Sequence, residues 1–200
     1  MPEHHNRLVS YLFTSSFEVA MVGYIWALGL RPRGVSLREL IGGKWTRASD
    51  VLLDVGVAIL FWMAVGIMLT LMRAILGENA AAIRAMKLLL PQSLVEMAAF
   101  VLLSVTAGFC EELMFRGYLQ RQFLALTQRP AAAVALQALV FGAAHSYQGW
   151  KSAVTITVYG AMFGILALLR KSLRPGMLQH AMQDSFAGIA GSLLARRGYF

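Results

Sequence analysis

The sequence predicts an all-α protein, a polytopic integral membrane bundle of about six transmembrane helices. The chain is 58% hydrophobic and only 14% charged, and its mean hydropathy is +0.62. Ordinary soluble domains are about 45–50% apolar, and a chain of 200 residues forms too small a core to hide the excess from water. The apolar residues also gather in long runs separated by short basic segments, as expected of helices that cross a bilayer.

The net charge of +8 comes from short basic clusters between the apolar runs. This distribution is typical of loops that face anionic lipid headgroups. The sequence has no aromatic-plus-basic RNA motif and no zinc-finger spacing, which argues against nucleic-acid binding. The single cysteine, Cys110, excludes an intrachain disulfide framework and a cysteine-rich metal cage.

The first apolar run covers residues 8–30, contains Glu18, and ends at a charged segment with proline and glycine, residues 31–34. This run is too long for the core of a signal peptide and lacks a clear small-x-small cleavage site. We therefore expect it to be a retained membrane anchor.

The second predicted span, residues 51–76, follows a basic loop and is long enough to cross the hydrocarbon core. Asp50 and Asp54 lie at its start, where the helix dipole favours acidic side chains. Residues 78–90 mix apolar and basic side chains. They predict either an interfacial amphipathic helix or a loop.

Four further spans are predicted from Pro91 onward, a residue that suits the start of a helix. The first runs to about Phe109 and on through the acidic pair that follows it. The remaining three cover residues 131–145, 152–169 and 177–194. No repeat or linker divides the chain into separate domains. Because the reactive-looking residues all lie between Glu111 and Asp184, we expect supporting helices at residues 1–90 and the functional core at residues 91–195.

The basic residues also predict a topology. Their excess places the loops 31–47, 121–129 and 170–174 in the cytoplasm and the N-terminus outside, although other basic residues fall on the opposite side. The predicted location is a bacterial inner membrane, which the chain crosses several times.

Two adjacent carboxylates and an arginine lie within the apolar sequence of residues 108–116. Ionisable side chains are costly at membrane depth, so their default interpretation is functional. Glu112 and Arg116 are four residues apart and face each other on a helix, while Glu111 points about 100° away. This geometry predicts that Arg116 holds Glu112 and that Glu111 is free to act as a general base. The alternative is a structural charge network at a helix end.

Two isolated histidines follow in equally apolar surroundings. Three small residues separate Phe141 from His145 in the sequence and permit close helix packing. Polar residues come directly after His145. We therefore expect His145 near a helix end, within reach of water. His180 and Asp184 share a helix face. They could satisfy each other by a hydrogen bond, ligate a metal, or polarise a substrate carbonyl.

Jointly, the motifs EExxxR, FxxxH and HxxxD, in this order on predicted membrane helices, resemble those of the CPBP family of intramembrane proteases. This family of CAAX proteases and bacteriocin-processing enzymes includes the eukaryotic type II CAAX prenyl endopeptidases and the bacterial Abi proteins. The resemblance covers about residues 93–194, with the motifs at residues 111–116, 141–145 and 180–184. The third motif ends in Asp184, where many members have Asn.

The resemblance implies an endopeptidase that hydrolyses peptide bonds of membrane-associated peptides or proteins. The catalytic set that it implies is Glu111, Glu112, His145, His180 and Asp184, supported by Arg116 and Phe141. Glu111 and His145 would activate a water molecule, and His180 and Asp184 would stabilise the oxyanion. An ionised Asp184 can only accept hydrogen bonds. It would have to be protonated, orient His180 so that the imidazole donates, or bind a cation.

Metal dependence is a separate question, since the family is commonly labelled as metalloproteases. A mixed nitrogen and oxygen zinc site could be built from Glu111, His145, His180 and Asp184. The motif HExxH is absent, however, and these ligands would come from three separate helices. A metal-free glutamate mechanism fits the same residues, and it is the one we favour.

The alternative function is a non-hydrolytic membrane protein. It could be a bacteriocin-immunity or partner-binding factor, or a proton pathway built from the same carboxylates and histidines. The sequence shows no broken helices in matching halves and no inverted repeat, which argues against transport. A pure scaffold would have no need of side chains that are so costly in lipid. The oligomeric state is left open by the sequence.

Overall fold

The structure of the chain, a computed structural model, describes residues 6–198, which contain helices and no strand. The α-helices are α1 (Arg7–Tyr24), α2 (Leu37–Ile41), α3 (Ala48–Leu76), α4 (Ala80–Leu89), α5 (Leu94–Glu111), α6 (Gln120–Thr127), α7 (Pro130–Ala144), α8 (Trp150–Arg170) and α9 (Arg174–Arg196). Short π and 3-10 segments adjoin them at Ile25–Leu30, Arg31–Arg33, Glu112–Leu119 and Ser146–Gln148. The predicted all-α class is confirmed for the described residues.

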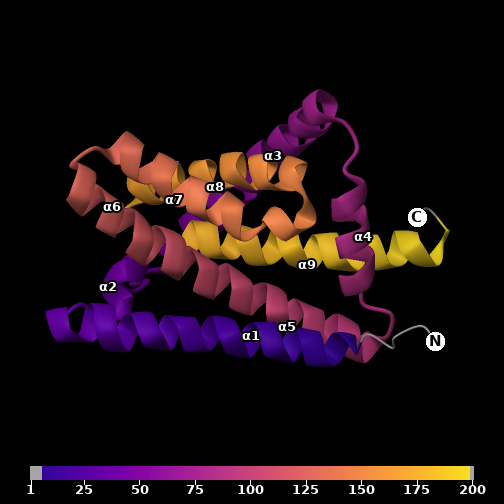
Figure 1. Cartoon of the computed structure of the whole chain (residues 1–200). Helices are drawn as coiled ribbons and strands as arrows, with labels where there is room; N and C mark the ends of the chain where they lie inside the picture. The colour runs from indigo at the N-terminus through magenta and orange to yellow at the C-terminus, as the bar shows by residue number, and fades with distance from the viewer. Residues whose placement is uncertain (1–5, 199–200) are drawn as a thin grey trace.

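The helices form a bundle in which α9 lies between other long helices (Figure 1). α9 packs against α5 on one side and against α3 on the other, and α5 also packs along α1. α7 and α8, joined by a short turn, pack along each other. The three motifs lie where α5 meets the π-helix Glu112–Leu119, at the end of α7 and on α9. The packing of α9 on α5 and of α7 on that π-helix brings them together.

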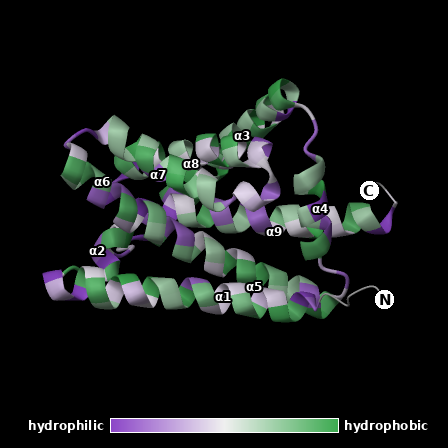
Figure 2. Cartoon of the chain, viewed as in Figure 1, coloured by the Kyte–Doolittle hydropathy of each residue, from purple (hydrophilic) through white to green (hydrophobic). Residues whose placement is uncertain are grey.

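Four helical segments are long and apolar enough to cross a membrane: residues 7–33, 48–76, 94–127 and 150–170. Their outer surface is apolar. In α3, Leu52, Leu60 and Ile75 are 72%, 68% and 71% exposed. Figure 2 shows the hydrophobic colouring along α1, α3 and α8, with hydrophilic residues at connections such as that between α6 and α7. Exposed apolar surface of this extent is suited to contact with lipid.

The predicted count of about six spans is not confirmed. α7 has 15 residues, fewer than the roughly 20 that cross the hydrocarbon core. α9 has 23 residues, but polar side chains interrupt its apolar sequence at Gln179, His180, Gln183 and Asp184. The two predicted spans that are not confirmed as membrane crossings are therefore α7, whose end places His145, and α9, which carries His180.

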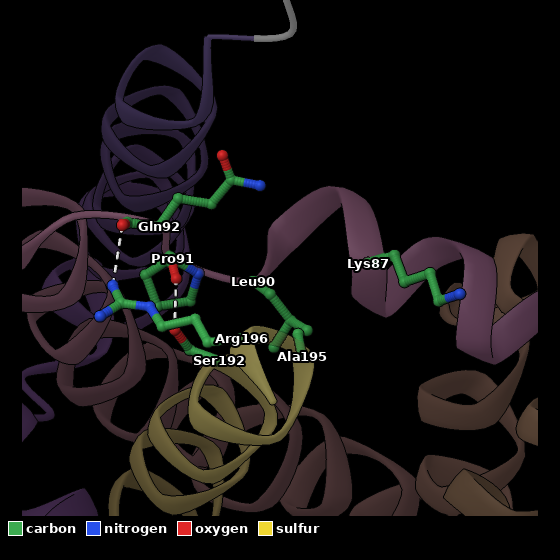
Figure 3. A pocket seen from close by; sticks show the side chains of 7 residues that line it. All are labelled: Lys87, Leu90, Pro91, Gln92, Ser192, Ala195 and Arg196. Carbon is green, nitrogen blue, oxygen red and sulfur yellow. Dashed lines mark hydrogen bonds between the residues drawn. The ribbon is translucent and has the colours of Figure 1, made fainter. Parts of the chain in front are cut away.

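Residues 78–90, predicted as an interfacial helix or a loop, contain the helix α4. Figure 3 shows the connection from α4 to α5 against the C-terminal part of α9, around a pocket of about 440 Å³. Ser192 Oγ donates a hydrogen bond to the Pro91 carbonyl oxygen (2.5 Å), and Arg196 Nη2 donates to the Gln92 carbonyl oxygen (2.8 Å). These bonds fasten the start of α5 to the end of α9.

Asp54 of α3 fastens the bundle at the junction of α8 and α9. Its carboxylate pairs with Arg170 (3.2 Å) and Arg174 (2.9 Å) and accepts a hydrogen bond from Trp45 Nε1 (2.7 Å). The helix-dipole explanation fits Asp50, which accepts hydrogen bonds from two backbone N–H groups at the start of α3. For Asp54 it is incomplete, because this residue is buried and its partners come from other parts of the chain.

Two glycines allow the helices of the motifs to approach closely. A Cβ atom at Gly108 of α5 would lie 2.8 Å from the backbone nitrogen of Ala181 on α9. A Cβ atom at Gly142 of α7 would overlap the side chain of Thr157 on α8. Small residues at such contacts let the backbones of membrane helices come together. The spacing between α5 and α9 therefore depends on the absence of a side chain at Gly108.

Candidate active site

The adjacent carboxylates lie where the helix changes type. α5 ends at Glu111, and the following eight residues, Glu112–Leu119, form a π-helix. Single π turns within helices occur frequently at functional sites. The wider turn does not prevent the pairing predicted from α-helical spacing, since Glu112 and Arg116 are in contact.

Glu112 and Arg116 form a buried ion pair. Arg116 Nη1 donates to Glu112 Oε1 over 2.8 Å, and the two side chains are 1% and 0% exposed. Arg116 Nη2 donates to the Gly160 carbonyl oxygen of α8 (3.2 Å), and the guanidinium carbon lies 4.4 Å from the centroid of the Phe141 ring. Because each buried charge has a partner, neither is left uncompensated. Phe141 packs on this pair and helps to keep water from it.

His180 connects the carboxylates of α5 with Asp184 of α9. Its Nδ1 lies 3.2 Å from Glu112 Oε1, and its Nε2 lies 3.7 Å from Glu111 Oε2 and 3.6 Å from Asp184 Oδ2. An ionised carboxylate can only accept, so Nδ1 donates to Glu112. Three carboxylates around one imidazole stabilise its charged form, in which Nε2 also carries a hydrogen.

His145 caps the end of α7, as expected for a histidine within reach of water. Its Nδ1 lies 2.9 Å from the Phe141 carbonyl oxygen. Because a carbonyl oxygen only accepts, Nδ1 carries the hydrogen, and Nε2 of the neutral ring is left as an acceptor. The Phe141 ring meets the imidazole edge-on, with centroids 4.8 Å apart. The backbone and side chain of Phe141 thus orient His145.

A pocket of about 590 Å³ opens between these helices and brings together Glu111, His145, His180 and Asp184. The rest of its lining is mainly apolar, from side chains of α3, α5 and α8. Glu112 and Arg116 do not line the pocket and lie behind its wall. A largely apolar pocket with a few convergent polar groups is the usual form of a substrate site.

The same four side chains are the ones that the sequence offers as metal ligands. Among the described residues, no three His, Cys, Asp or Glu side chains are grouped closely enough to hold a metal ion. The arrangement of Glu111, His145, His180 and Asp184 therefore does not fit a preformed zinc site, and we derive no step through a metal.

Several polar residues of the pocket lie outside the predicted set, among them Gln183 and Glu18. Gln183 lines the pocket and accepts a hydrogen bond from Trp62 Nε1 (2.6 Å). Glu18 of α1 also lines the pocket, although it belongs to the part of the chain predicted to be supporting. The signal for Glu18 is present in the sequence, as a carboxylate inside an apolar run. Its position in the pocket depends on the packing of α1 on α5.

Comparison with known families matches the segment that carries the site. The sequence model of the Rce1-like type II CAAX prenyl endopeptidase family matches residues 93–186, which include all three motifs. No curated protein and no solved structure matches the chain. The resemblance predicted from the motifs is confirmed, and the family implies a protease in a membrane.

Proposed function

We propose that this chain, whose residues 93–186 match the Rce1-like endopeptidases, is an intramembrane endopeptidase. It hydrolyses peptide bonds of membrane-associated peptides or proteins, as a multi-pass protein of a bacterial inner membrane. The observation that supports this most directly is the convergence of Glu111, His145, His180 and Asp184 on one pocket. Such groups are costly at membrane depth, and here three distant parts of the chain supply them.

Water activation is assigned to Glu111 and His145. Glu111 is the carboxylate of the adjacent pair that faces the pocket, whereas Glu112 is held by Arg116. A water molecule held by Glu111 and His145 Nε2 transfers a proton to Glu111, and its oxygen adds to the carbonyl carbon of the scissile bond. Glu111 then passes the proton to the leaving amine as the C–N bond breaks.

Oxyanion stabilisation is assigned to His180. Glu112 holds Nδ1 of the ring, so that Nε2–H faces the pocket and can donate to the tetrahedral oxyanion. Asp184 lies beside that same Nε2 and not beside Nδ1, so Glu112 supplies the orientation of the ring. We assign to Asp184 an electrostatic role, in which its carboxylate keeps the imidazole charged.

The test is cleavage of a membrane-peptide library by the purified protein, with products identified by mass spectrometry. We expect Glu111→Ala and His145→Ala to abolish products that the wild type forms. Glu78→Gln changes the charge of an exposed residue outside the site, and this variant should form the same products as the wild type. If neither alanine variant removes any product, the endopeptidase proposal fails. The non-hydrolytic alternative, a binding factor or proton pathway, would then be favoured.

The mechanism assigned to these residues needs no metal. We therefore expect cleavage to survive exhaustive chelation. If chelation removes activity and zinc restores it, a metal mechanism replaces the one assigned here.

A further inference from the structure

Glu18 is a buried carboxylate of α1 that no motif and no step of the mechanism uses. The residue is 8% exposed, and its Oε2 has no hydrogen-bond partner among the described residues. A buried carboxylate is strongly unfavourable as a charge without a partner, so an ionised Glu18 needs a counter-charge from the chain or from a ligand. The position of Glu18 shows where that ligand would come from.

Glu18 lines the same pocket as the proposed catalytic residues Glu111, His180 and Asp184. None of the described residues that line this pocket is a lysine or an arginine. Arg116, which is behind the pocket wall, already pairs with Glu112. No lysine or arginine of the pocket lining is therefore available to pair with Glu18.

The pocket has more acidic than basic side chains. Its lining contains three carboxylates, Glu18, Glu111 and Asp184, and two imidazoles, His145 and His180. With all three carboxylates ionised, even two protonated imidazoles leave one carboxylate without a counterpart. Of the three, Glu18 makes no hydrogen bond or ion pair with another described residue, whereas Glu111 and Asp184 share His180.

We propose that Glu18 is a specificity-determining residue that binds a cationic side chain of the substrate, a lysine or an arginine close to the scissile bond. The long aliphatic stems of these side chains suit the apolar lining of the pocket, while their charged ends complement Glu18. The inference rests on the proposed endopeptidase function for its substrate. Glu18 lies outside the segment that matches the family.

The first test compares peptides cleaved by the wild type, resynthesised in sets that carry Lys, Gln or Glu near the scissile bond. We expect kcat/KM to be about tenfold or more higher for Lys than for Gln, through a lower KM. In Glu18→Gln this ratio should fall to within about twofold of one, and Glu78→Gln should keep the wild-type ratio. Because the ratio is taken within each variant, a general loss of active protein does not affect it. An unchanged ratio in Glu18→Gln overturns the inference.

The second test measures binding without cleavage, using benzamidine and its uncharged analogue benzamide. By calorimetry in detergent micelles, the wild type and Glu111→Gln should bind benzamidine about tenfold more tightly than benzamide, and Glu18→Gln should bind the two alike. If no peptide is cleaved but this discrimination is found, the proposed function fails while the cation site stands. If cleavage depends on Glu111 and neither assay depends on Glu18, only the cation site fails.

Discussion

Glu111 and Glu112 are neighbours in sequence with different surroundings. Glu112 is sealed behind the pocket by Arg116 and His180, and Glu111 faces the pocket. The Glu112 carboxylate is paired with Arg116 and does not line the pocket, whereas the Glu111 carboxylate can contact a water molecule or a substrate there. The two residues should therefore respond differently to the same substitution.

Glu112→Gln is expected to lower the free energy of unfolding by about 3–5 kcal/mol, because it leaves Arg116 buried without a counter-charge. Denaturant unfolding in detergent micelles would measure the change. Glu111→Gln should retain most of that stability and lose roughly 10²–10⁴-fold in kcat/KM, the contribution of a general base. Equal destabilisation by the two substitutions would contradict the separation of roles.

Asp184→Asn replaces an acceptor by an amide that can donate a hydrogen bond to an oxyanion. Asp184→Ala loses the carboxylate without that compensation. We therefore expect kcat of the Asn variant to exceed that of the Ala variant by about tenfold or more, somewhat less than the effect of a full oxyanion-hole donor. Peptide cleavage at saturating substrate measures this ratio. An Asn variant no better than Ala would show that a hydrogen-bond donor at position 184 does not stabilise the oxyanion, and would leave the electrostatic effect of the Asp184 carboxylate on His180 as the role of this position.

The contacts that the sequence predicts correctly are those between residues four apart. Glu112 meets Arg116, and His180 meets Asp184, as helix periodicity requires. The contact between His180 and Glu112, and the position of Glu18 in the pocket, follow from how α1, α5 and α9 pack. Residue spacing carries no information on that packing, so these two features could not be predicted.

The helices also divide into those that the sequence predicts and those that it does not. Long apolar runs predict the helices well, as for residues 51–76 within α3 and 152–169 within α8. The short helix α2 was not predicted, although Ser36 and Glu39 form a capping box at its start. Hydrogen bonds from the Ser36 backbone and hydroxyl lower the pKa of Glu39, which favours the charged form of the Glu39 side chain in this capping box. The π-helix at Glu112–Leu119 has no hydropathy signal and could not be predicted.

Gly108→Ala tests whether the approach of α5 to α9 places the site. The added Cβ would lie 2.8 Å from the backbone of Ala181, which cannot move as a side chain would. We expect a loss of about 1–3 kcal/mol in stability, typical of overpacking, together with a fall in kcat as Glu111 moves away from His180. Unfolding and cleavage of the same preparation would measure both.

Gly56→Ala is the matched control for that substitution. Gly56 lies on α3, and an added Cβ there meets no atom within 4 Å. It should stabilise the helix by about 0.5–1 kcal/mol and leave cleavage unchanged. If Gly108→Ala behaves as Gly56→Ala does, the close contact of α5 and α9 is not what positions the site.

At the scale of the whole molecule, the pocket is built from both parts of the chain. The matched segment at residues 93–186 supplies the proposed catalytic side chains, and α1 supplies Glu18. Distant segments must therefore be held in register for the pocket to exist. The bonds at Pro91 and Gln92 hold α5 to α9, and Asp54 holds α3 to the junction of α8 and α9.

Asp54→Asn tests this long-range fastening. The amide can still accept a hydrogen bond from Trp45, but it no longer neutralises Arg170 and Arg174. Because these arginines are 30% and 17% exposed, water compensates part of the loss. We expect the free energy of unfolding to fall by about 1.5–3 kcal/mol, the range for hydrogen bonds to charged groups. Asp50→Asn, which alters an exposed cap of the same helix, should have a smaller effect in the same denaturant titration. Equal effects would mean that Asp54 acts only at the start of α3 and does not hold α8 and α9 in place.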